Sequence, residues 1–189
     1  MSVHAQAQRS RGKDDWETPR DVFRTVCQLY CLNPKVDVAA TYGNHKCAKF
    51  FTDSLDKKWS YPWFCNPPFN LKEEFVRKAD EEFRRAGHDG IMLLPNIITE
   101  RDWFHDIILN ADGTGFNDGI EVYFHKKRIR FLDDGVEGCQ PVSGTIWIVW
   151  SKRPLKERKK NYKWEDPMIL ILRYQRKCKS NAVNDVIRV

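Results

Sequence analysis

The sequence predicts an α/β fold in which a largely parallel sheet carries an antiparallel hairpin on one edge. Between residues 35 and 108, short apolar runs of strand type alternate with runs of helical spacing. Three β-type runs then follow one another between residues 120 and 150, which favours antiparallel pairing. With 189 residues and 41% hydrophobic content, the chain can bury one core and is too short for two.

Composition divides the chain into three parts. Residues 1–14 show no apolar periodicity and are predicted to form a disordered basic tail. Residues 15–150 contain the predicted helices and most strands, and we expect them to form one domain. After residue 150 the composition shifts to Lys, Arg and Asn, with one apolar strand-like run at 168–172. Residues 151–189 are therefore predicted to be a basic extension that packs on or flanks the domain.

The first helix has clear start and stop signals. Thr18 is a natural N-cap, Pro19 suits the first helical position, and Asp21 completes a capping box. Apolar residues recur at helical spacing from residue 22 to residue 30, and Asn33 followed by proline ends the helix.

The later elements follow from apolar spacing and turn residues. Gly87 predicts a helix stop, and Thr99 with Asp102 is a second helix-start pattern. The predicted strands are 35–40, 49–52, 63–65, 90–95, 120–124, 128–131 and 145–150, and the predicted helices are 71–86 and the segment that starts at residue 99.

Charge and cysteine content narrow the class of protein. The formal net charge is +6, and the basic residues cluster at 126–130 and 152–160, a pattern that fits phosphate contact and equally an ordinary solvated surface. The apolar runs are far shorter than the roughly 20 residues of a membrane span, and the start carries no export signal. We therefore expect no membrane association and a cytoplasmic or nuclear location.

The six cysteines are scattered and most lie in apolar-periodic segments, where a free thiol behaves as a small hydrophobe. Cys27, Cys31, His45 and Cys47 could be assembled into a metal site, but their spacing matches no zinc pattern. We therefore expect a reducing compartment, no disulfide framework and no metal.

Residues 63–69, Trp-Phe-Cys-Asn-Pro-Pro-Phe, carry the strongest chemical signal. Two prolines stop the predicted strand and place Asn66 and Phe69 at its carboxyl end, where open α/β sheets bind ligands. The Asn66 side-chain oxygen and the Pro67 carbonyl can each accept one hydrogen of an amine, so that its lone pair points at an electrophilic methyl group. Pro68 stiffens the acceptors, and the Phe69 ring can stack on a base.

A methyl donor implies S-adenosylmethionine, which needs a pocket beside the same strand ends. Asp37 closes the first predicted strand and can take the donor's ammonium group or its water shell. Asp53 closes the second and can accept from the adenosine part. An aspartate after a strand is also a common turn or helix cap, so it is their order before Asn66 that favours the donor pocket.

These motifs resemble the phage-type DNA N6-adenine methyltransferase family. The resemblance covers residues 14–150, in the family's order, and its most selective parts are Trp-x-Thr-Pro at 16–19, Asp-Val-Ala-Ala at 37–40 and Asn-Pro-Pro-Phe at 66–69. It implies a Rossmann-like methyltransferase fold and methylation of adenine in double-stranded DNA, with the base flipped out of the duplex. Phe69 stands where the family more often has tyrosine, and the glycine-rich turn of many methyltransferases is absent.

The resemblance also implies roles for individual residues. The catalytic set is Asn66, Pro67, Pro68 and Phe69. The implied donor-binding set is Trp16, Thr18, Pro19, Asp37, Ala39, Ala40, Asn44, Asp53 and Leu55. The predicted DNA-binding set, which starts near the catalytic strand end, is Lys127, Arg128, Arg130 and Ser143.

Two alternatives remain open from the sequence. The same pair of acceptors would serve methylation of an RNA base or of a protein glutamine. A non-catalytic nucleic-acid-binding module could keep the fold without binding the donor. The sequence shows no separate target-recognition domain, and it is compatible with a monomer or a homodimer.

Overall fold

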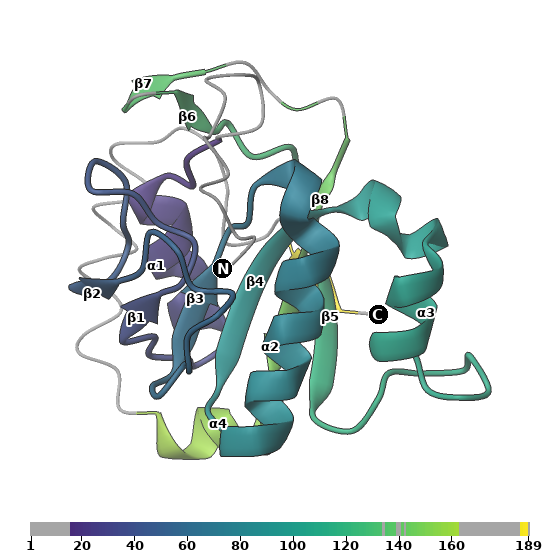
Figure 1. The fold of residues 1–189 in the computed structure, drawn as a ribbon. Helices are drawn as coiled ribbons and strands as arrows, with labels where there is room; N and C mark the ends of the chain where they lie inside the picture. Colours follow the sequence, from purple (N-terminus) through teal and green to yellow (C-terminus); the bar gives the residue numbers. More distant parts are fainter. Residues whose placement is uncertain (1–15, 134, 139–140, 142, 163–185, 189) are drawn as a thin grey trace, which may run out of the picture.

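The computed structural model describes residues 16–133, 135–138, 141, 143–162 and 186–188, and its centre is a seven-stranded sheet (Figure 1). The strand order is β2-β1-β3-β4-β8-β5-β9. The strands are β1 (Val36–Asp37), β2 (Lys49–Phe50), β3 (Trp63–Cys65), β4 (Gly90–Pro95), β5 (Ile120–His125), β8 (Thr145–Trp150) and β9 (Val186–Arg188). A separate two-stranded sheet pairs β6 (Leu132–Asp133) with β7 (Val136–Glu137).

The sheet confirms the predicted mixed architecture, which is Rossmann-like. Strands β2, β1, β3 and β4 are parallel to one another. Strand β8 is antiparallel to both β4 and β5, and β9 is antiparallel to β5. Parallel strands therefore occupy one half of the sheet, and the antiparallel strands complete the other edge.

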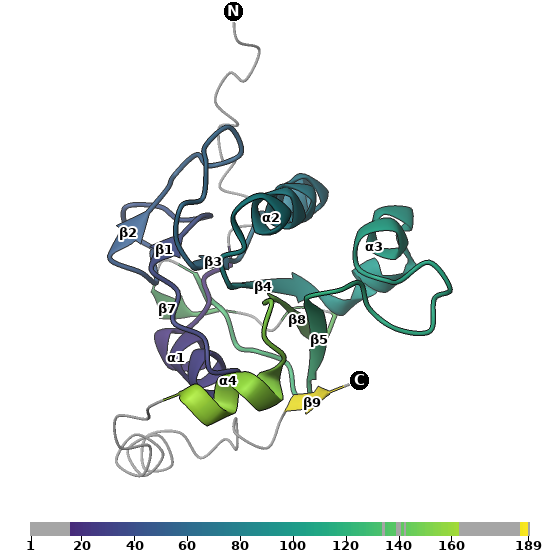
Figure 2. The same cartoon turned by 90° about the horizontal axis from the view of Figure 1, so that it is seen from below.

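Helices cover both faces of the sheet (Figure 2). The helices are α1 (Arg20–Leu29), the 3-10 helix η1 (Phe69–Leu71), α2 (Lys72–Ala86), the 3-10 helix η2 (Asn96–Glu100), α3 (Asp102–Ile107) and α4 (Leu155–Asn161). Helices α2 and α3 pack on one face, and α1 and α4 lie on the other. Among the described residues, no helix combines the length and the apolar character that a membrane span requires.

Strand alternation sorts the core residues between the two faces. Trp63 and Cys65 of β3 pack under α2, whereas Phe64 packs with α1 on the other face. A Cβ atom at Gly90 would lie 2.1 Å from two ring carbons of Trp63, so this position on β4 must be glycine for the indole to pack there. Side chains of β3 and β4 thus pack closely against the helices on both faces of the sheet.

The predicted helix starts at Thr18 and Thr99 are wrong, whereas Gly87 ends α2 as predicted. Helix α1 begins at Arg20 after Pro19, and no side chain caps it, because the Thr18 side chain is buried instead. It ends at Leu29, before the predicted stop. Likewise α3 begins after Arg101, and the Thr99 hydroxyl donates to the Asn96 carbonyl within the preceding 3-10 helix.

The predicted strand at 128–131 is also absent. Ile129 and Phe131 are buried while Arg128 and Arg130 are exposed, so the residues alternate as in a strand but form no strand ladder. The pairing starts one residue later, where Leu132 exchanges two backbone hydrogen bonds of 2.9 Å with Glu17. Alternating apolar and polar residues therefore predict which side chains are buried, but they do not show whether the segment pairs with a neighbouring strand.

Part of the basic extension packs on the domain. Arg158 of α4 is buried and donates to the carbonyl of Tyr30 at 2.9 Å, and β9 pairs with β5. The tail at 1–14 and the strand-like run at 168–172 lie outside the described residues.

Candidate active site

The polar residues singled out in the sequence gather at the carboxyl edge of the parallel strands. Asp37 ends β1 and Asn66 follows β3, and β1 and β3 are neighbours in the sheet. This edge is at the top of Figure 1, where α2 begins and the β6–β7 pair lies. It is the edge at which open α/β sheets bind their ligands.

The main chain of Trp16 orients Asn66. The Asn66 side-chain nitrogen Nδ2 donates to the Trp16 carbonyl at 2.6 Å. Trp16 is fixed by the adjacent pairing of Glu17 with Leu132 and by contact with Phe131, whose ring centroid lies 6.4 Å from that of Trp16. Only the nitrogen end of the amide can face a carbonyl, so Oδ1 is left as an acceptor. No described residue donates to it.

The two prolines and the aromatic residue lead directly into a helix. Pro67 is buried, and no described residue donates to its carbonyl oxygen. Pro68 precedes the 3-10 helix and accepts from the Leu71 N–H at 3.0 Å, and Lys72 donates to the Phe69 carbonyl at 2.7 Å. The segment therefore has little freedom to move relative to α2.

A small pocket lies against Asn66. Its walls are mainly apolar, with Phe69 and Phe131 among them, and the side chains of Ser143 and Thr145 supply two hydroxyl groups. The described residues that line it are Asn66, Phe69, Leu93, Leu94, Pro95, Phe131, Pro141, Ser143 and Thr145. An apolar pocket with a few convergent polar groups is typical of a small-ligand site.

Asp37 is buried in the structure. Its two carboxylate oxygens accept from the backbone N–H groups of Ala39 at 3.2 Å and Lys46 at 2.8 Å. Burial raises the pKa of Asp37 to about 6, and these two N–H groups oppose the rise. The Asp37 carboxylate therefore caps a turn, which is the common structural role of an aspartate after a strand. It also lies at the end of β1, where a bound cation would stabilise its negative charge.

Lys46 was missed in the sequence. Its Nζ donates to Asn44 Oδ1 at 2.6 Å, so Asn44, Lys46 and Asp37 form one connected group. Burial lowers the pKa of Lys46, while Glu17 and Asp37 act to raise it. A lysine in a turn is usually solvated, so the residue type gave no signal. Its position two residues after Asn44 was the only one.

Thr18 supplies a further polar group without a partner. Its side chain is 1% exposed, and its Oγ1 has no hydrogen-bond partner among the described residues. Pro19 follows it, and Arg20 donates to the His45 carbonyl at 2.9 Å. Residues 16–20 therefore lie close to both Asn66 and the turn that holds Asn44.

The turn after β2 is joined to β1. The Ser54 hydroxyl, also missed in the sequence, donates to the Val38 carbonyl at 2.6 Å, and the Ala40 N–H donates to the Phe51 carbonyl at 3.0 Å. Leu55 packs partly against the core, whereas Asp53 is exposed. Asp53 therefore lies shortly after the end of β2, and its side chain is exposed.

The basic segment begins at the same edge. Strand β5 ends at His125, and residues 126–131 follow it toward Phe131 in the pocket wall. Lys127, Arg128 and Arg130 are exposed, and Ser143 lies in the pocket itself. The segment therefore reaches the pocket of Asn66 at Phe131, and its basic side chains are not among the described lining residues.

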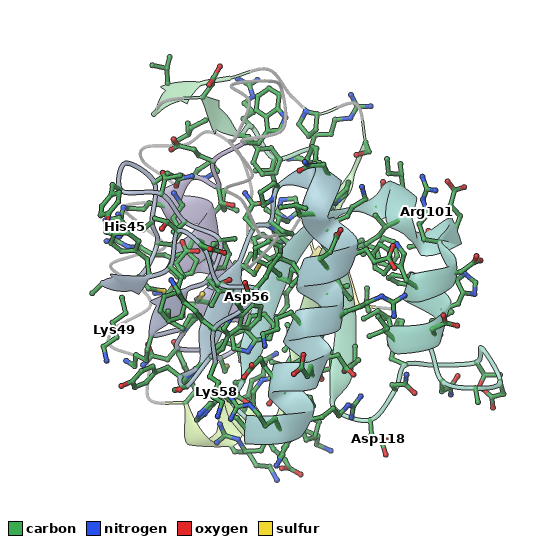
Figure 3. All side chains as sticks on the ribbon, viewed as in Figure 1. His45, Lys49, Asp56, Lys58, Arg101 and Asp118 are labelled. Atoms are coloured by element: carbon green, nitrogen blue, oxygen red, sulfur yellow. The ribbon has the colours of Figure 1, made fainter. Side chains whose placement is uncertain are left out.

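A second, open groove lies between α2 and α3. It is lined by side chains of both charge signs, including Lys72, Glu73 and Arg101. Figure 3 labels Arg101 beside the start of α3, and His45 on the opposite side of the molecule near β2. In the described ranges, no three or more His, Cys, Asp or Glu side chains form a group that could hold a metal ion. Four cysteines lie in these ranges, and all four are buried free thiols.

The chain was compared with protein-family models and with curated proteins. Residues 6–177 match the family described as DNA N-6-adenine-methyltransferase (Dam). The comparison with curated proteins gave no match. The family match covers most of the chain and includes every strand end that forms the candidate site. The chain therefore belongs to the DNA N-6-adenine-methyltransferase (Dam) family, whose reaction is methylation of adenine in DNA.

Proposed function

We propose that this protein transfers a methyl group from S-adenosylmethionine to the N6 atom of an adenine flipped out of double-stranded DNA. The observation that carries the proposal is the hydrogen bond from Asn66 Nδ2 to the Trp16 carbonyl, because it turns Oδ1 into a fixed acceptor at the end of β3. Family membership supports the reaction, and the residues at the edge support the mechanism.

The residues present fit the donor. Its ammonium group would lie near the Asp37 carboxylate, and its carboxylate would lie near Lys46. The buried Thr18 hydroxyl lacks a partner among the described residues and can bond to the donor's polar end. Pro19, Ala39, Ala40 and Asn44 would shape this end, whereas Asp53 and Leu55 would face the adenosine part. When bound, S-adenosylmethionine supplies an electrophilic methyl group.

Asn66 and Pro67 would prepare the amine. An exocyclic amine is a poor nucleophile because its lone pair is delocalised into the base. If Asn66 Oδ1 and the Pro67 carbonyl each accept one N–H, the nitrogen is held with its lone pair directed away from the ring. A neutral amide is too weak a base to remove a proton first, so the amine loses its proton after it has become cationic.

Phe69 and the basic segment would hold the substrate. Stacking on an aromatic ring contributes roughly 1 to 3 kcal/mol per base, which offsets part of the few kcal/mol needed to extract a base from the duplex. Lys127, Arg128 and Arg130 would contact phosphates beside the pocket, and Ser143 would contact the flipped nucleotide. Pro68 would contribute rigidity, since it joins the acceptors to the helix that carries Phe69.

The competing functions make different predictions. Methylation of an RNA base or of a protein glutamine would use the same acceptors, and only the labelled polymer would differ. A non-catalytic DNA-binding module would not need the three polar groups around the proposed donor site. These groups are the Asp37 carboxylate, the Lys46 ammonium and the Thr18 hydroxyl. Binding of S-adenosylmethionine separates that alternative from an enzyme.

The decisive experiment incubates the protein with methyl-labelled S-adenosylmethionine and unmethylated duplex DNA, followed by nucleoside analysis. We expect N6-methyladenine from the wild-type protein, and a loss of at least about a hundredfold in Asn66→Ala. Label in cytosine, in RNA only or in protein only would overturn the proposal.

A matched control uses a second asparagine close to the motif. Asn70 is exposed and lies one residue after Phe69, so Asn70→Ala removes an amide without changing the acceptor. We expect this variant to keep its activity. Calorimetry should show that Asn66→Ala still binds the donor, because the proposed donor contacts are made by other residues.

A further inference from the structure

We propose that the hydroxyl group of Thr145 recognises the edge of the flipped adenine, as a specificity-determining contact opposite Asn66. The inference rests on the proposed function and deepens it, because it assigns a second polar contact to the same base. Thr145 did not stand out in the sequence, where it is the first residue of an apolar strand.

The side chain is buried without a partner. Thr145 is 4% exposed, and its Oγ1 forms no hydrogen bond with any described residue. A buried hydroxyl that lacks a partner costs stability, and valine would fit the same strand position with nearly the same shape and no polar atom. The threonine therefore gains no hydrogen bond from the described residues that valine would lose at this position.

The position of Thr145 in the sheet explains why it can reach a base. It opens β8 opposite Pro95, the last residue of β4, so it lies at the same edge as Asn66. Thr145, Asn66 and Phe69 line one pocket. Other buried polar side-chain atoms also lack partners, but among the described residues that line this pocket only Thr145 has such an atom.

The chemistry of adenine matches this arrangement. An adenine stacked on Phe69, with its amine at Asn66 Oδ1, presents ring nitrogens that can only accept hydrogen bonds. The Thr145 hydroxyl can donate to one of these nitrogens, and the rest of the pocket is mostly apolar. A site that is built to hydrogen-bond its substrate rejects an analogue that lacks the group, because the site's own polar atom is then left unpaired.

The test uses Thr145→Val, Thr145→Ser and duplexes that contain the sequence methylated by the wild-type protein. In each duplex the target adenine is replaced by 1-deaza-, 3-deaza- or 7-deazaadenine, which exchange one ring nitrogen for a C–H group. We expect one of the three analogues to lower the wild-type kcat/KM by about tenfold or more. Thr145→Val should lose a similar factor on adenine and be insensitive to that same analogue, whereas Thr145→Ser should remain sensitive.

Folding and general effects are controlled separately. Thr145→Val should unfold at a temperature equal to or above that of the wild type, since it removes an unpaired buried group. Thr99→Val makes the same substitution outside the pocket, where the hydroxyl bonds to the Asn96 carbonyl, and it should retain the wild-type response to all three analogues.

Two outcomes would overturn the inference. If Thr145→Val methylates adenine as well as the wild type does, the hydroxyl has no role in the reaction. If Thr145→Val responds to each analogue by the same factor as the wild type, the hydroxyl does not contact a ring nitrogen. Wild-type protein that yields no N6-methyladenine would instead reject the proposed function, and this inference with it.

Discussion

The amino and carboxyl edges of the parallel strands differ in how their buried polar groups are paired. At the amino edge, where α4 lies, the buried Arg158 guanidinium donates to the Tyr30 carbonyl at 2.9 Å, to the Arg153 carbonyl at 2.6 Å and to the Glu121 carboxylate at 2.6 Å. At the carboxyl edge, the Thr18 and Thr145 hydroxyls have no partner among the described residues. The amino edge pairs the buried charge of Arg158, although Trp63 Nε1 has no partner there among the described residues, and the carboxyl edge keeps two threonine hydroxyls available for ligands.

Glu82 gives a second example at the amino edge. This buried carboxylate accepts from the Trp59 N–H at 3.1 Å and from Lys78 at 2.8 Å, and it also pairs with Arg85. Helix α2 is thereby fixed to the segment that precedes β3, while the other end of the same helix follows Phe69. We therefore expect substitutions at the amino edge to change stability and those at the carboxyl edge to change activity.

The largest expected effect is that of Arg158→Met on stability. This change removes the buried guanidinium that pairs with the Glu121 carboxylate, whose side chain is 11% exposed. Breaking a buried ion pair in this way costs about 3 to 5 kcal/mol of unfolding free energy, measured by urea denaturation. Arg153→Met is the control, because its ion pair with Asp89 is exposed and should contribute less than about 1 kcal/mol. Equal losses in the two variants would contradict the contrast between the edges.

Trp16→Ala should change activity more than stability. Without the indole contact to Phe131, the carbonyl that orients Asn66 loses its support, and kcat should fall by about 10- to 100-fold while the donor dissociation constant changes little. Steady-state kinetics and calorimetry measure the two quantities. Trp16→Phe keeps an aromatic ring and should recover most of kcat. A variant that loses donor affinity in place of kcat would show that Trp16 belongs to the donor site, as the family resemblance implied.

Donor affinity should depend on pH through Asp37. The pKa of Asp37 is raised to about 6, so its carboxylate is mostly ionised at pH 7 and mostly protonated at pH 5. Because the donor's ammonium group favours the ionised form, the dissociation constant should rise by about tenfold from pH 7 to pH 5. Isothermal titration calorimetry at three pH values checks this, and Asp37→Asn should bind weakly with no such dependence.

The same carboxylate should affect stability with the opposite sign. The folded protein retains a proton on Asp37 between about pH 4 and pH 6, whereas the unfolded chain has already lost it. The contribution of Asp37 to the free energy of unfolding therefore falls as pH rises through this window. Urea denaturation of the wild type and of Asp37→Asn isolates that contribution as the difference between the two pH profiles.

The smallest expected effect is that of Arg128→Ala on DNA binding. Loss of one phosphate contact should weaken binding several-fold at low salt and reduce the slope of log affinity against log salt by about 0.9. Lys58→Ala is the control, because Lys58 is exposed on the segment before β3, at the amino edge (Figure 3). An identical slope for wild type and Arg128→Ala would remove the basic segment from the DNA interface.

Local patterns predicted the strands best where prolines end them, whereas the strands predicted at 35–40 and 49–52 are only two residues long and the one at 128–131 is absent. The strands at 63–65 and 90–95 were predicted with the bounds that the structure shows, since prolines end both. The shared carboxyl edge of Asp37 and Asn66 followed from the parallel strand order. The caps at Thr18 and Thr99 failed because burial and a 3-10 turn competed with the capping pattern.

Contacts between distant residues could not be predicted. The partner of Asn66 is a main-chain carbonyl, which leaves no trace in residue type, and its support at Leu132 is remote in the sequence. The functional interest of Thr145 and Lys46 depends on what surrounds them, and neither residue type suggests it. The roles proposed for the site residues stay predictions until the substitutions are measured.

The pairing of Glu17 with Leu132 has a consequence for the order in which the protein matures. Residue 17 leaves the ribosome early, but its partner is made only after β1 to β5 have been synthesised. Until then the Trp16 carbonyl has no fixed place, and the amide of Asn66 has no defined orientation. A nascent or truncated chain could therefore contain the whole Asn-Pro-Pro-Phe segment and still be unable to methylate DNA.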